Sequence, residues 1–191
     1  MKLLNKIYAL GLLFLAGMLF TACGGDDATP KPDAFLRLDY PMGTYKLFDD
    51  GCPYTFGINS LAKVKNKGNC NLEIYYPKMK ATLYLTYKPV RNNIDSLLRD
   101  AENLTYKHVI KADDIMSEPY INYDRNVYGL FSQVGGDAAT NAQFYVTDTL
   151  HHFVTGSMYF YAKPNYDSIM PAASYLRDDM RNIMETLKWK K

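Results

Sequence analysis

Apolar and polar residues alternate in several short segments of the chain, and these segments are separated by proline, glycine or asparagine. The clearest is residues 81–88, Ala-Thr-Leu-Tyr-Leu-Thr-Tyr-Lys, which place Leu83, Leu85 and Tyr87 on one face. Residues of these types fit a pleated, half-buried strand. Looser forms of the pattern predict further strands at residues 35–40, 54–58, 72–76, 126–134, 143–149 and 151–161.

Two other segments carry apolar residues at every third or fourth position, which is the spacing of one helix face. In the first segment these residues are Ile94, Leu97, Leu98, Ala101 and Leu104. We expect Asn92 or Asn93 to cap this helix by accepting a hydrogen bond from an early backbone N–H. The apolar stripe predicts that the helix lies on a sheet.

The second helical segment is C-terminal and has the longer stripe. Its apolar residues are Ile169, Ala172, Leu176, Met180, Ile183 and Leu187. We predict that Asp167 or Ser168 caps this helix and that Pro171 lies in its first turn, where a missing N–H costs little. Arg181 and Glu185 are expected to pair on the exposed side.

The predicted order is a group of strands, a helix, three strands and a second helix. Short connections between strands favour antiparallel pairing, and the helices have to cover the sheet. We therefore predict an α+β fold, a mostly antiparallel sheet covered by two helices. This order is similar to the Mog1/PsbP-like fold, a likeness that by itself carries no function.

The N-terminus has the order of positive charge, apolar run and small residues that is typical of a secretory signal. The apolar run at residues 7–20 is about 14 residues long, whereas a membrane-spanning helix needs roughly 20. Phe-Thr-Ala-Cys at residues 20–23 resembles the bacterial lipobox, with Phe20 in place of the usual Leu. We predict a signal peptide at residues 1–22 and lipid attachment at Cys23; the alternative is a permanent transmembrane helix.

The mature chain divides into a tether and one domain. Residues 24–33 contain no large apolar side chain, so residues 23–34 are expected to form the lipidated Cys23 and a flexible tether. Residues 35–191 are long enough to bury a core and are predicted to form a single domain. Acyl chains such as palmitate would anchor it to a membrane, and both the inner and the outer membrane stay open.

Composition excludes one class of partner and draws attention to one residue type. The formal net charge of +2 gives no basis for nucleic acid binding, which needs a strong basic cluster. The 17 tyrosines offer large apolar area with a polar tip, which suits both half-buried strands and interaction surfaces. We therefore predict no nucleic acid partner.

Two cysteines remain once Cys23 is lipidated. In an exported protein, Cys52 and Cys70 are expected to form a disulfide worth about 3 kcal/mol. The alternative is two free thiols. A metal site is not expected, because no nearby Cys or His completes a tetrahedral set.

The residue types that could carry catalysis occur in patterns that favour structural roles. His151 and His152 are neighbours on a predicted strand and should point to opposite faces, so they are poorly placed to bind one metal. The acidic pairs at residues 49–50 and 113–114 are typical of turns. The glycines at residues 135–136 stand between strands, whereas a phosphate loop precedes a helix. We predict neither an enzyme nor a bound cofactor.

Aromatic and polar residues crowd the corner between the last strand and the C-terminal helix. We predict a docking surface there, formed by Tyr161, Lys163, Asn165 and Tyr166. The alternative is a structural corner that packs its own rings. A second hypothesis for function is a small-molecule or glycan-binding groove of roughly 300 Å³ or more. Its walls would be tyrosines such as Tyr84, Tyr159 and Tyr161.

Longer motifs of the mature chain resemble one known family. They are Tyr-Pro-Lys-Met-Lys-Ala at 76–81, Thr-Tyr-Lys-Pro-Val at 86–90, Gly-Asp-Ala-Ala-Thr at 136–140, Gln-Phe-Tyr-Val-Thr-Asp at 143–148, Phe-Tyr-Ala-Lys-Pro-Asn-Tyr-Asp-Ser at 160–168 and Met-Glu-Thr-Leu-Lys-Trp at 184–189. With Cys23 and Pro-Lys-Pro at 30–32, they resemble the gliding-motility lipoprotein GldD family of the Bacteroidetes over nearly the whole mature chain.

The resemblance implies a non-enzymatic accessory lipoprotein that supports gliding and the associated type IX secretion machinery. That family has no established catalytic residues, so only lipid attachment at Cys23 is carried over. The implied partners are a membrane, through the lipid anchor, and protein components of the gliding and secretion complex. The domain is expected in the periplasm. In an organism that does not glide, secretion or envelope assembly is the remaining role.

Overall fold

The computed structural model describes residues 40–106, 114–135, 140–161 and 166–190. The predicted signal segment, Cys23 and the tether lie outside these residues. The strand predicted at residues 35–40 also lies outside them except for Tyr40, which belongs to irregular chain before the first observed strand.

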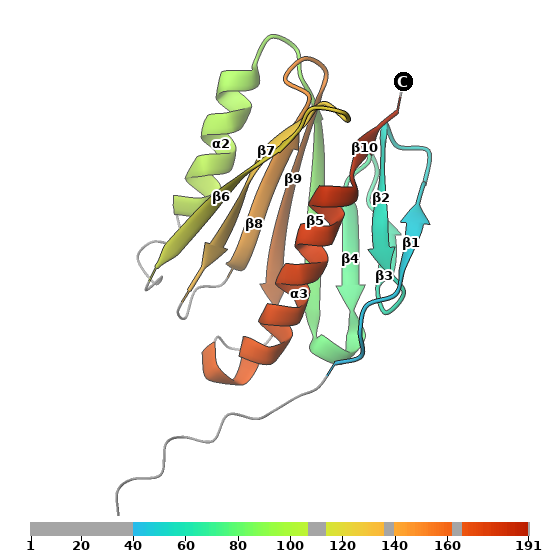
Figure 1. Ribbon diagram of the computed structural model, residues 1–191, viewed down its shortest axis with the longest axis vertical. Helices are drawn as coiled ribbons and strands as arrows, with labels where there is room; N and C mark the ends of the chain where they lie inside the picture. Colours follow the sequence, from blue (N-terminus) through green and yellow to red (C-terminus); the bar gives the residue numbers. More distant parts are fainter. Residues whose placement is uncertain (1–39, 107–113, 136–139, 162–165, 191) are drawn as a thin grey trace, which may run out of the picture. The chain divides into compact units, whose positions relative to one another are not determined.

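Within these described ranges, seven strands form one large sheet in which every neighbouring pair is antiparallel (Figure 1). From edge to edge they are β3 (Lys63–Asn66), β4 (Leu72–Tyr76), β5 (Ala81–Pro89), β9 (His152–Phe160), β8 (Thr140–Thr147), β7 (Val127–Val134) and β6 (Ile115–Asn122). The short 3-10 helix η1 (Pro77–Met79) connects β4 to β5.

A second, smaller sheet and two α-helices complete the described part of the chain. The small sheet has the order β1 (Tyr45–Phe48), β2 (Tyr54–Asn59) and β10 (Lys188–Trp189). The helices are α2 (Ile94–Tyr106) and α3 (Tyr166–Thr186). The predicted α+β class, with a mostly antiparallel sheet and two helices, is confirmed. The likeness to the Mog1/PsbP-like fold stays a prediction.

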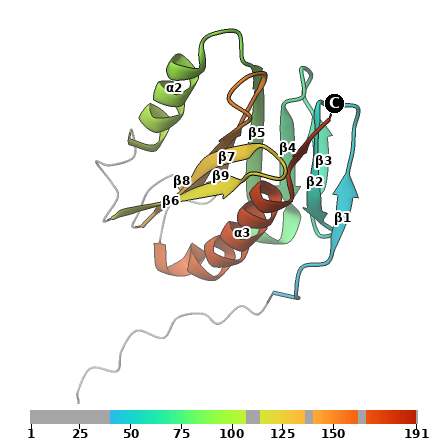
Figure 2. The same cartoon turned by 45° about the horizontal axis from the view of Figure 1, so that its top comes forward.

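The two faces of the large sheet have different coverings. The core face contributes Ile74 and Leu83 to the main buried cluster, together with residues of α3 and the small sheet. The opposite face, which we call the outer face, is partly covered by α2, whose Leu97 and Ala101 pack against Phe153 of β9. Figure 2 shows α2 and α3 on opposite sides of the sheet. The predicted contact of the first helix with a sheet is therefore correct.

The sequence pattern does not predict four of the observed strands, which are β1, β3, β6 and β10. As a consequence, four described strands lie between α2 and α3 instead of the predicted three, and β10 follows α3. β6 forms one edge of the large sheet and contains Pro119. An edge strand tolerates proline because one of its sides has no neighbour to bond. β3 forms the other edge and exposes Lys63 and Lys65, so few of its side chains are apolar and buried.

The predicted capping residue of α2 is correct, but its side chain does not make the predicted hydrogen bond to the helix. The main-chain carbonyl of Asn93 accepts hydrogen bonds from the N–H groups of Ser96 and Leu97, each at 3.1 Å. The side-chain oxygen of Asn93 accepts instead from the N–H of Arg91 at 2.7 Å. The side chain therefore stabilises the turn that enters the helix.

Two predictions about α3 are wrong, namely the residue at which it begins and the ion pair on its surface. The helix begins at Tyr166, so Asp167 and Ser168 lie inside it and Pro171 lies beyond the position predicted for it. Arg181 does not pair with its helix neighbour Glu185. It reaches across to β6, where Glu118 lies 2.9 Å away, and its guanidinium stacks over the ring of Phe131 at 4.6 Å. The contacts of Arg181 with an acidic and an aromatic group on the sheet stabilise it more than an exposed ion pair within the helix would.

The predicted disulfide is present between Cys52 and Cys70, whose Cα atoms are 5.5 Å apart. It joins the segment before β2 to the turn between β3 and β4. The hydroxyl of Tyr54 donates a hydrogen bond to the carbonyl of Cys70 at 2.7 Å, which adds a second link at the same place. The free-thiol alternative is wrong.

Candidate functional site

An open groove of about 510 Å³ lies on the outer face of the large sheet, beside the edge strand β3. We call it the tyrosine groove. Its lining residues are Lys63, Val64, Lys65, Glu73, Tyr75, Thr82 and Tyr161. Its volume falls within the roughly 300–1,000 Å³ that is typical of ligand-binding pockets.

Strand alternation and register place these side chains together. Lys63 of β3 is paired with Tyr75 of β4, and Tyr75 is paired with Thr82 of β5. Lys65 and Glu73 form the next pair on the same face. Directly opposite residues in antiparallel strands have Cβ atoms about 4.5–5.5 Å apart. The groove therefore rests on rigid sheet, although its basic strand was not predicted from the sequence.

Tyr161 is held over this surface although its side chain is 65% exposed. It follows β9, and its N–H donates to the carbonyl of Lys80 at 2.9 Å. Its hydroxyl lies 3.0 Å from the hydroxyl of Thr82 and 3.3 Å from that of Tyr84. Its ring meets the ring of Tyr75 edge-on, with centroids 6.3 Å apart. These contacts fix an exposed aromatic side chain in one orientation.

The structure brings together the three tyrosines named by the ligand-binding hypothesis. Tyr161 lines the groove, and Tyr84 lies next to it through the hydroxyl contact. Tyr159 packs edge-on against Tyr84 at a centroid distance of 5.6 Å. All three lie on or beside the outer face, and the groove exceeds the volume that the hypothesis requires.

The groove is positively charged. Glu73 is already paired with Lys67 at 3.2 Å. Within the described ranges, no carboxylate lies within ion-pair distance of Lys63 or Lys65. The hydrogen bond between the hydroxyls of Tyr84 and Tyr161, together with partial burial, raises the pKa of Tyr84 to about 12. The Tyr84 phenol is therefore neutral at physiological pH.

The docking surface predicted from the sequence is described only in part. Tyr161 is exposed and belongs to the tyrosine groove. Lys163 and Asn165 lie outside the described residues, and Tyr166 is described only as the first residue of α3. The docking surface as a whole stays a prediction.

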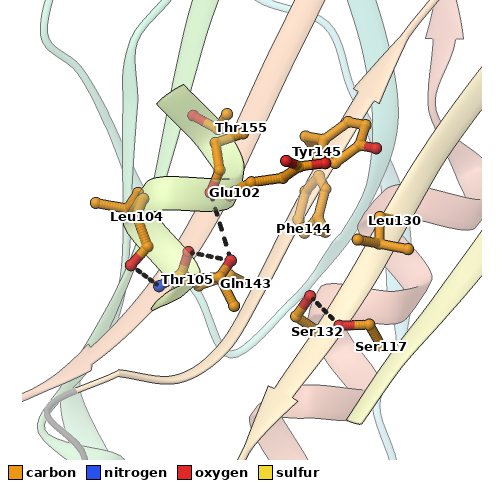
Figure 3. Close-up of a pocket in the computed structure, with 12 residues that line it drawn as sticks. Glu102, Leu104, Thr105, Ser117, Leu130, Ser132, Gln143, Phe144, Tyr145 and Thr155 are labelled. Atoms are coloured by element: carbon orange, nitrogen blue, oxygen red, sulfur yellow. Dashed lines mark hydrogen bonds between the residues drawn. The ribbon is translucent and has the colours of Figure 1, made fainter. Parts of the chain in front are cut away.

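A second cavity of about 170 Å³ lies between α2 and the sheet (Figure 3). Its polar groups mainly bond one another. The Thr105 hydroxyl donates to Oε1 of Gln143 at 3.2 Å, and Nε2 of Gln143 donates to the carbonyl of Leu104 at 3.4 Å. The hydroxyls of Ser117 and Ser132 lie 2.9 Å apart. The cavity is small for a ligand, and the hydrogen bonds of Gln143 attach the end of α2 to the sheet.

The two neighbouring histidines lie beside a turn. His151 is exposed and has Nδ1 3.5 Å from the carboxylate of Asp148. His152 begins β9 and stacks on the ring of Trp189, with centroids 5.1 Å apart. Its Nδ1 lies 2.9 Å from the hydroxyl of Tyr87. Among the described residues, no group of three His, Cys, Asp or Glu side chains is placed to hold a metal ion.

Asp148 organises that turn. Its Oδ1 accepts hydrogen bonds from the N–H groups of Leu150, His151 and His152 at 3.1, 2.8 and 2.7 Å. Burial raises the pKa of this carboxyl, but the three backbone donors outweigh burial and the pKa is lowered overall. The carboxylate therefore has a structural role in the β8–β9 hairpin.

Replacing Asp148 by alanine is expected to lower the free energy of unfolding by about 1–2 kcal/mol at pH 7, because three backbone donors lose their acceptor. A lowered pKa stabilises the fold above about pH 4, and this contribution is lost as the pH falls through the lowered pKa. Urea unfolding at pH 7 and pH 3 measures both effects. Asp124→Ala, at an exposed turn position, is the matched control. If Asp148→Ala lowered the free energy of unfolding by the same amount at pH 7 and at pH 3, the stabilising role of the ionised carboxylate would be contradicted.

A buried carboxylate in α3 was not singled out from the sequence. Asp179 is 2% exposed. It accepts from the hydroxyl of Tyr45 at 2.5 Å and from Nδ2 of Asn59 at 2.8 and 3.0 Å. Burial raises its pKa, and the hydrogen bonds offset this only in part. The sequence does contain a signal for this burial, because Asp179 lies three residues after Leu176 and four before Ile183. That spacing places it on the buried side of the helix.

The acidic pair at residues 49–50 belongs to a turn, as predicted. Oδ1 of Asp49 accepts from the N–H of Gly51 at 3.3 Å and pairs with Lys190. Oδ2 of Asp50 accepts from Nδ2 of Asn66 at 2.8 Å. Of the pair at residues 113–114, only Asp114 lies within the described residues.

Comparison with known proteins gives one family. The sequence profile of a family described as gliding motility lipoprotein GldD matches residues 25–189. No curated protein matches the chain significantly. In the part of the chain that the structure describes, no helix has the length and apolar character needed to cross a membrane.

Proposed function

Because this chain belongs to the gliding motility lipoprotein GldD family, we propose that it is a membrane-anchored accessory lipoprotein of the gliding-motility and type IX secretion machinery. In this proposal Cys23 carries the lipid and residues 24–34 connect it to the domain. The domain acts in the periplasm as a non-enzymatic assembly or interaction module. The observation that carries the proposal is the extent of the family match, which at residues 25–189 covers nearly all of the described chain.

An exposed strand edge supports contact with another protein. β1 forms the outer edge of the small sheet, so one of its sides has no neighbour among the described strands. Near this edge, Met42 is 94% exposed and Leu47 is 71% exposed. Unpaired strand edges bind strands of partner proteins. The edge lies close in sequence to the tether, so the lipid anchor would hold it near a membrane-bound complex.

The polar groups described above support a non-enzymatic role. Asp148 accepts three backbone hydrogen bonds, and Asp179 accepts bonds from Tyr45 and from the buried Asn59. His152 is stacked against Trp189. Each of these groups already stabilises the fold, and such a group is poorly placed to transfer a proton to a substrate.

Crosslinking with an amine-reactive reagent in intact cells, followed by mass spectrometry, tests the proposal. We expect crosslinks from Lys46, on the β1 edge, to components of the gliding or secretion machinery. Leu47→Glu should remove these crosslinks without unfolding the domain, because Leu47 is exposed. Cys23→Ser should release the protein from the membrane fraction. Crosslinks spread only over abundant envelope proteins would overturn the assembly role.

A further inference from the structure

We propose that the tyrosine groove binds an anionic saccharide chain, with sugar rings against Tyr75 and Tyr161 and acidic groups paired with Lys63 and Lys65. This inference goes beyond the assembly role and does not depend on it. It commits to one occupant, an acidic polysaccharide or oligosaccharide of the envelope. The groove is open, so a chain longer than the groove can extend past it.

The aromatic side chains are arranged to receive flat, partly apolar rings. Tyr161 is 65% exposed and Tyr75 is 37% exposed, yet each is held by its neighbours. Tyrosine offers a large, rigid, amphipathic contact surface at a low cost in conformational entropy. Because Tyr161 is already fixed by Thr82 and Tyr84, little further ordering is needed when a ligand binds.

The hydroxyl groups match a ligand that is rich in hydroxyls. Thr82, Tyr161 and Tyr84 form a short chain of hydroxyl contacts at 3.0 and 3.3 Å. A hydroxyl has one donor and two acceptor positions, and the hydroxyl of Tyr161 uses two of these three, so it keeps capacity to bond a ligand. Sugar hydroxyls both donate and accept.

The position of the groove favours a saccharide over an extended peptide. A peptide that adds to a sheet bonds the backbone of an edge strand. The tyrosine groove is lined instead by side chains on the sheet face, from β3, β4, β5 and the end of β9. Side-chain hydroxyls and ring surfaces therefore dominate the surface that a ligand meets.

Charge selects an acidic saccharide over a neutral one. Glu73 is neutralised by Lys67, which leaves Lys63 and Lys65 without a carboxylate partner among the described residues. Their positions on one four-residue strand place both charges along the same wall of the groove. Carboxylate or phosphate groups spaced along a saccharide chain can pair with both.

The test is calorimetric titration of the full-chain lipoprotein in neutral detergent. The probes are an α-1,4-linked galacturonic acid hexamer, the neutral hexamer maltohexaose and a hexaglutamate peptide. We expect the galacturonate hexamer to bind, and its affinity to fall as salt is raised. Lys63→Gln with Lys65→Gln should weaken it about tenfold, and Tyr161→Ala by a similar factor, roughly tenfold.

Matched controls change the same residue types elsewhere. Lys46→Gln and Tyr123→Ala alter exposed side chains outside the groove and should leave the affinity unchanged. Tyr161→Phe keeps the ring and removes the hydroxyl, so it separates stacking from hydrogen bonding. Because Tyr161 is exposed, its variants should keep the wild-type circular dichroism spectrum.

Three outcomes would overturn the inference. Equal affinity for maltohexaose would show that charge does not select the ligand. Hexaglutamate binding as tightly as the galacturonate hexamer, with both weakened by the groove variants, would identify an acidic peptide as the occupant. Absence of binding by the galacturonate hexamer, or binding that the groove variants leave unchanged, would remove the saccharide site. None of these results bears on the crosslinks expected at the β1 edge.

Discussion

Replacing Cys52 and Cys70 together by alanine is expected to lower the free energy of unfolding by about 3 kcal/mol. The two residues are 18 positions apart, so the bond closes a loop that contains β2 and β3. The crosslink limits the freedom of this loop in the unfolded chain. In the folded domain, β3 has only four residues and, among the described strands, pairs only with β4, so the crosslink is also a main attachment of this edge.

Urea unfolding with and without a reducing agent measures this contribution. The wild-type midpoint should fall when the disulfide is reduced, and the double variant should not respond to the reductant. Hydrogen exchange should show the largest loss of protection in β3, whose Lys63 and Lys65 form one wall of the tyrosine groove. An unchanged midpoint for the double variant would mean that the packing of β2 holds this region without the crosslink.

The sequence predicts the elements whose side chains are buried on a regular face. Residues 81–88 alternate strictly, and in β5 Leu83 and Leu85 are buried as this pattern requires. The C-terminal stripe likewise becomes the buried side of α3, where Leu176 and Met180 are fully enclosed. In both cases one face of the element is buried, and burial of apolar area is the main driving force of folding. The apolar residues therefore recur in the sequence with the period of the strand or the helix.

The strands at the edges of the sheets have a weaker hydrophobic pattern in the sequence. β1 is exposed at nearly all its positions, and β3 alternates a single valine with charged and polar residues. β6 is interrupted by Pro119, which a strand in the middle of a sheet would not tolerate. These strands are held by backbone bonds to a neighbour, and such bonds do not depend on the identity of the side chains.

The candidate site could be predicted only in part, because it combines strands that are distant in sequence. Tyr84, Tyr159 and Tyr161 were expected to share a groove, and the β5–β9 register places Tyr159 opposite Thr82. The basic wall was missed, since Lys63 and Lys65 lie on a strand that the pattern does not predict. The ion pair of Arg181 with Glu118 was missed for a related reason, because it depends on the packing of α3 over β6.

Replacing Asp179 by alanine is expected to destabilise the fold by about 2–3 kcal/mol, because buried donors lose their acceptor. Nδ2 of Asn59 would keep only the hydroxyl of Tyr175, 2.8 Å away. Tyr45 is partly exposed and can turn its hydroxyl to water, which keeps the loss below that of a fully buried ion pair. The affected bonds connect α3 to both β1 and β2, so the small sheet should loosen first.

The pH dependence of this loss identifies the carboxyl group as its source. Burial raises the pKa of Asp179, so the folded state keeps this proton at a higher pH than the unfolded state does. The contribution of the group is therefore largest below about pH 4 and declines as the pH rises through the raised pKa. Asp148, whose pKa is lowered, changes stability in the opposite direction.

Urea unfolding of Asp179→Ala and Asp179→Asn at pH 4, 6 and 8 measures this pH dependence, with the exposed turn variant Asp124→Ala as control. A deficit of Asp179→Ala that grows with rising pH would mean that the ionised carboxylate is the stabilising form. In that case its hydrogen bonds to Tyr45 and Asn59 would outweigh the cost of burial.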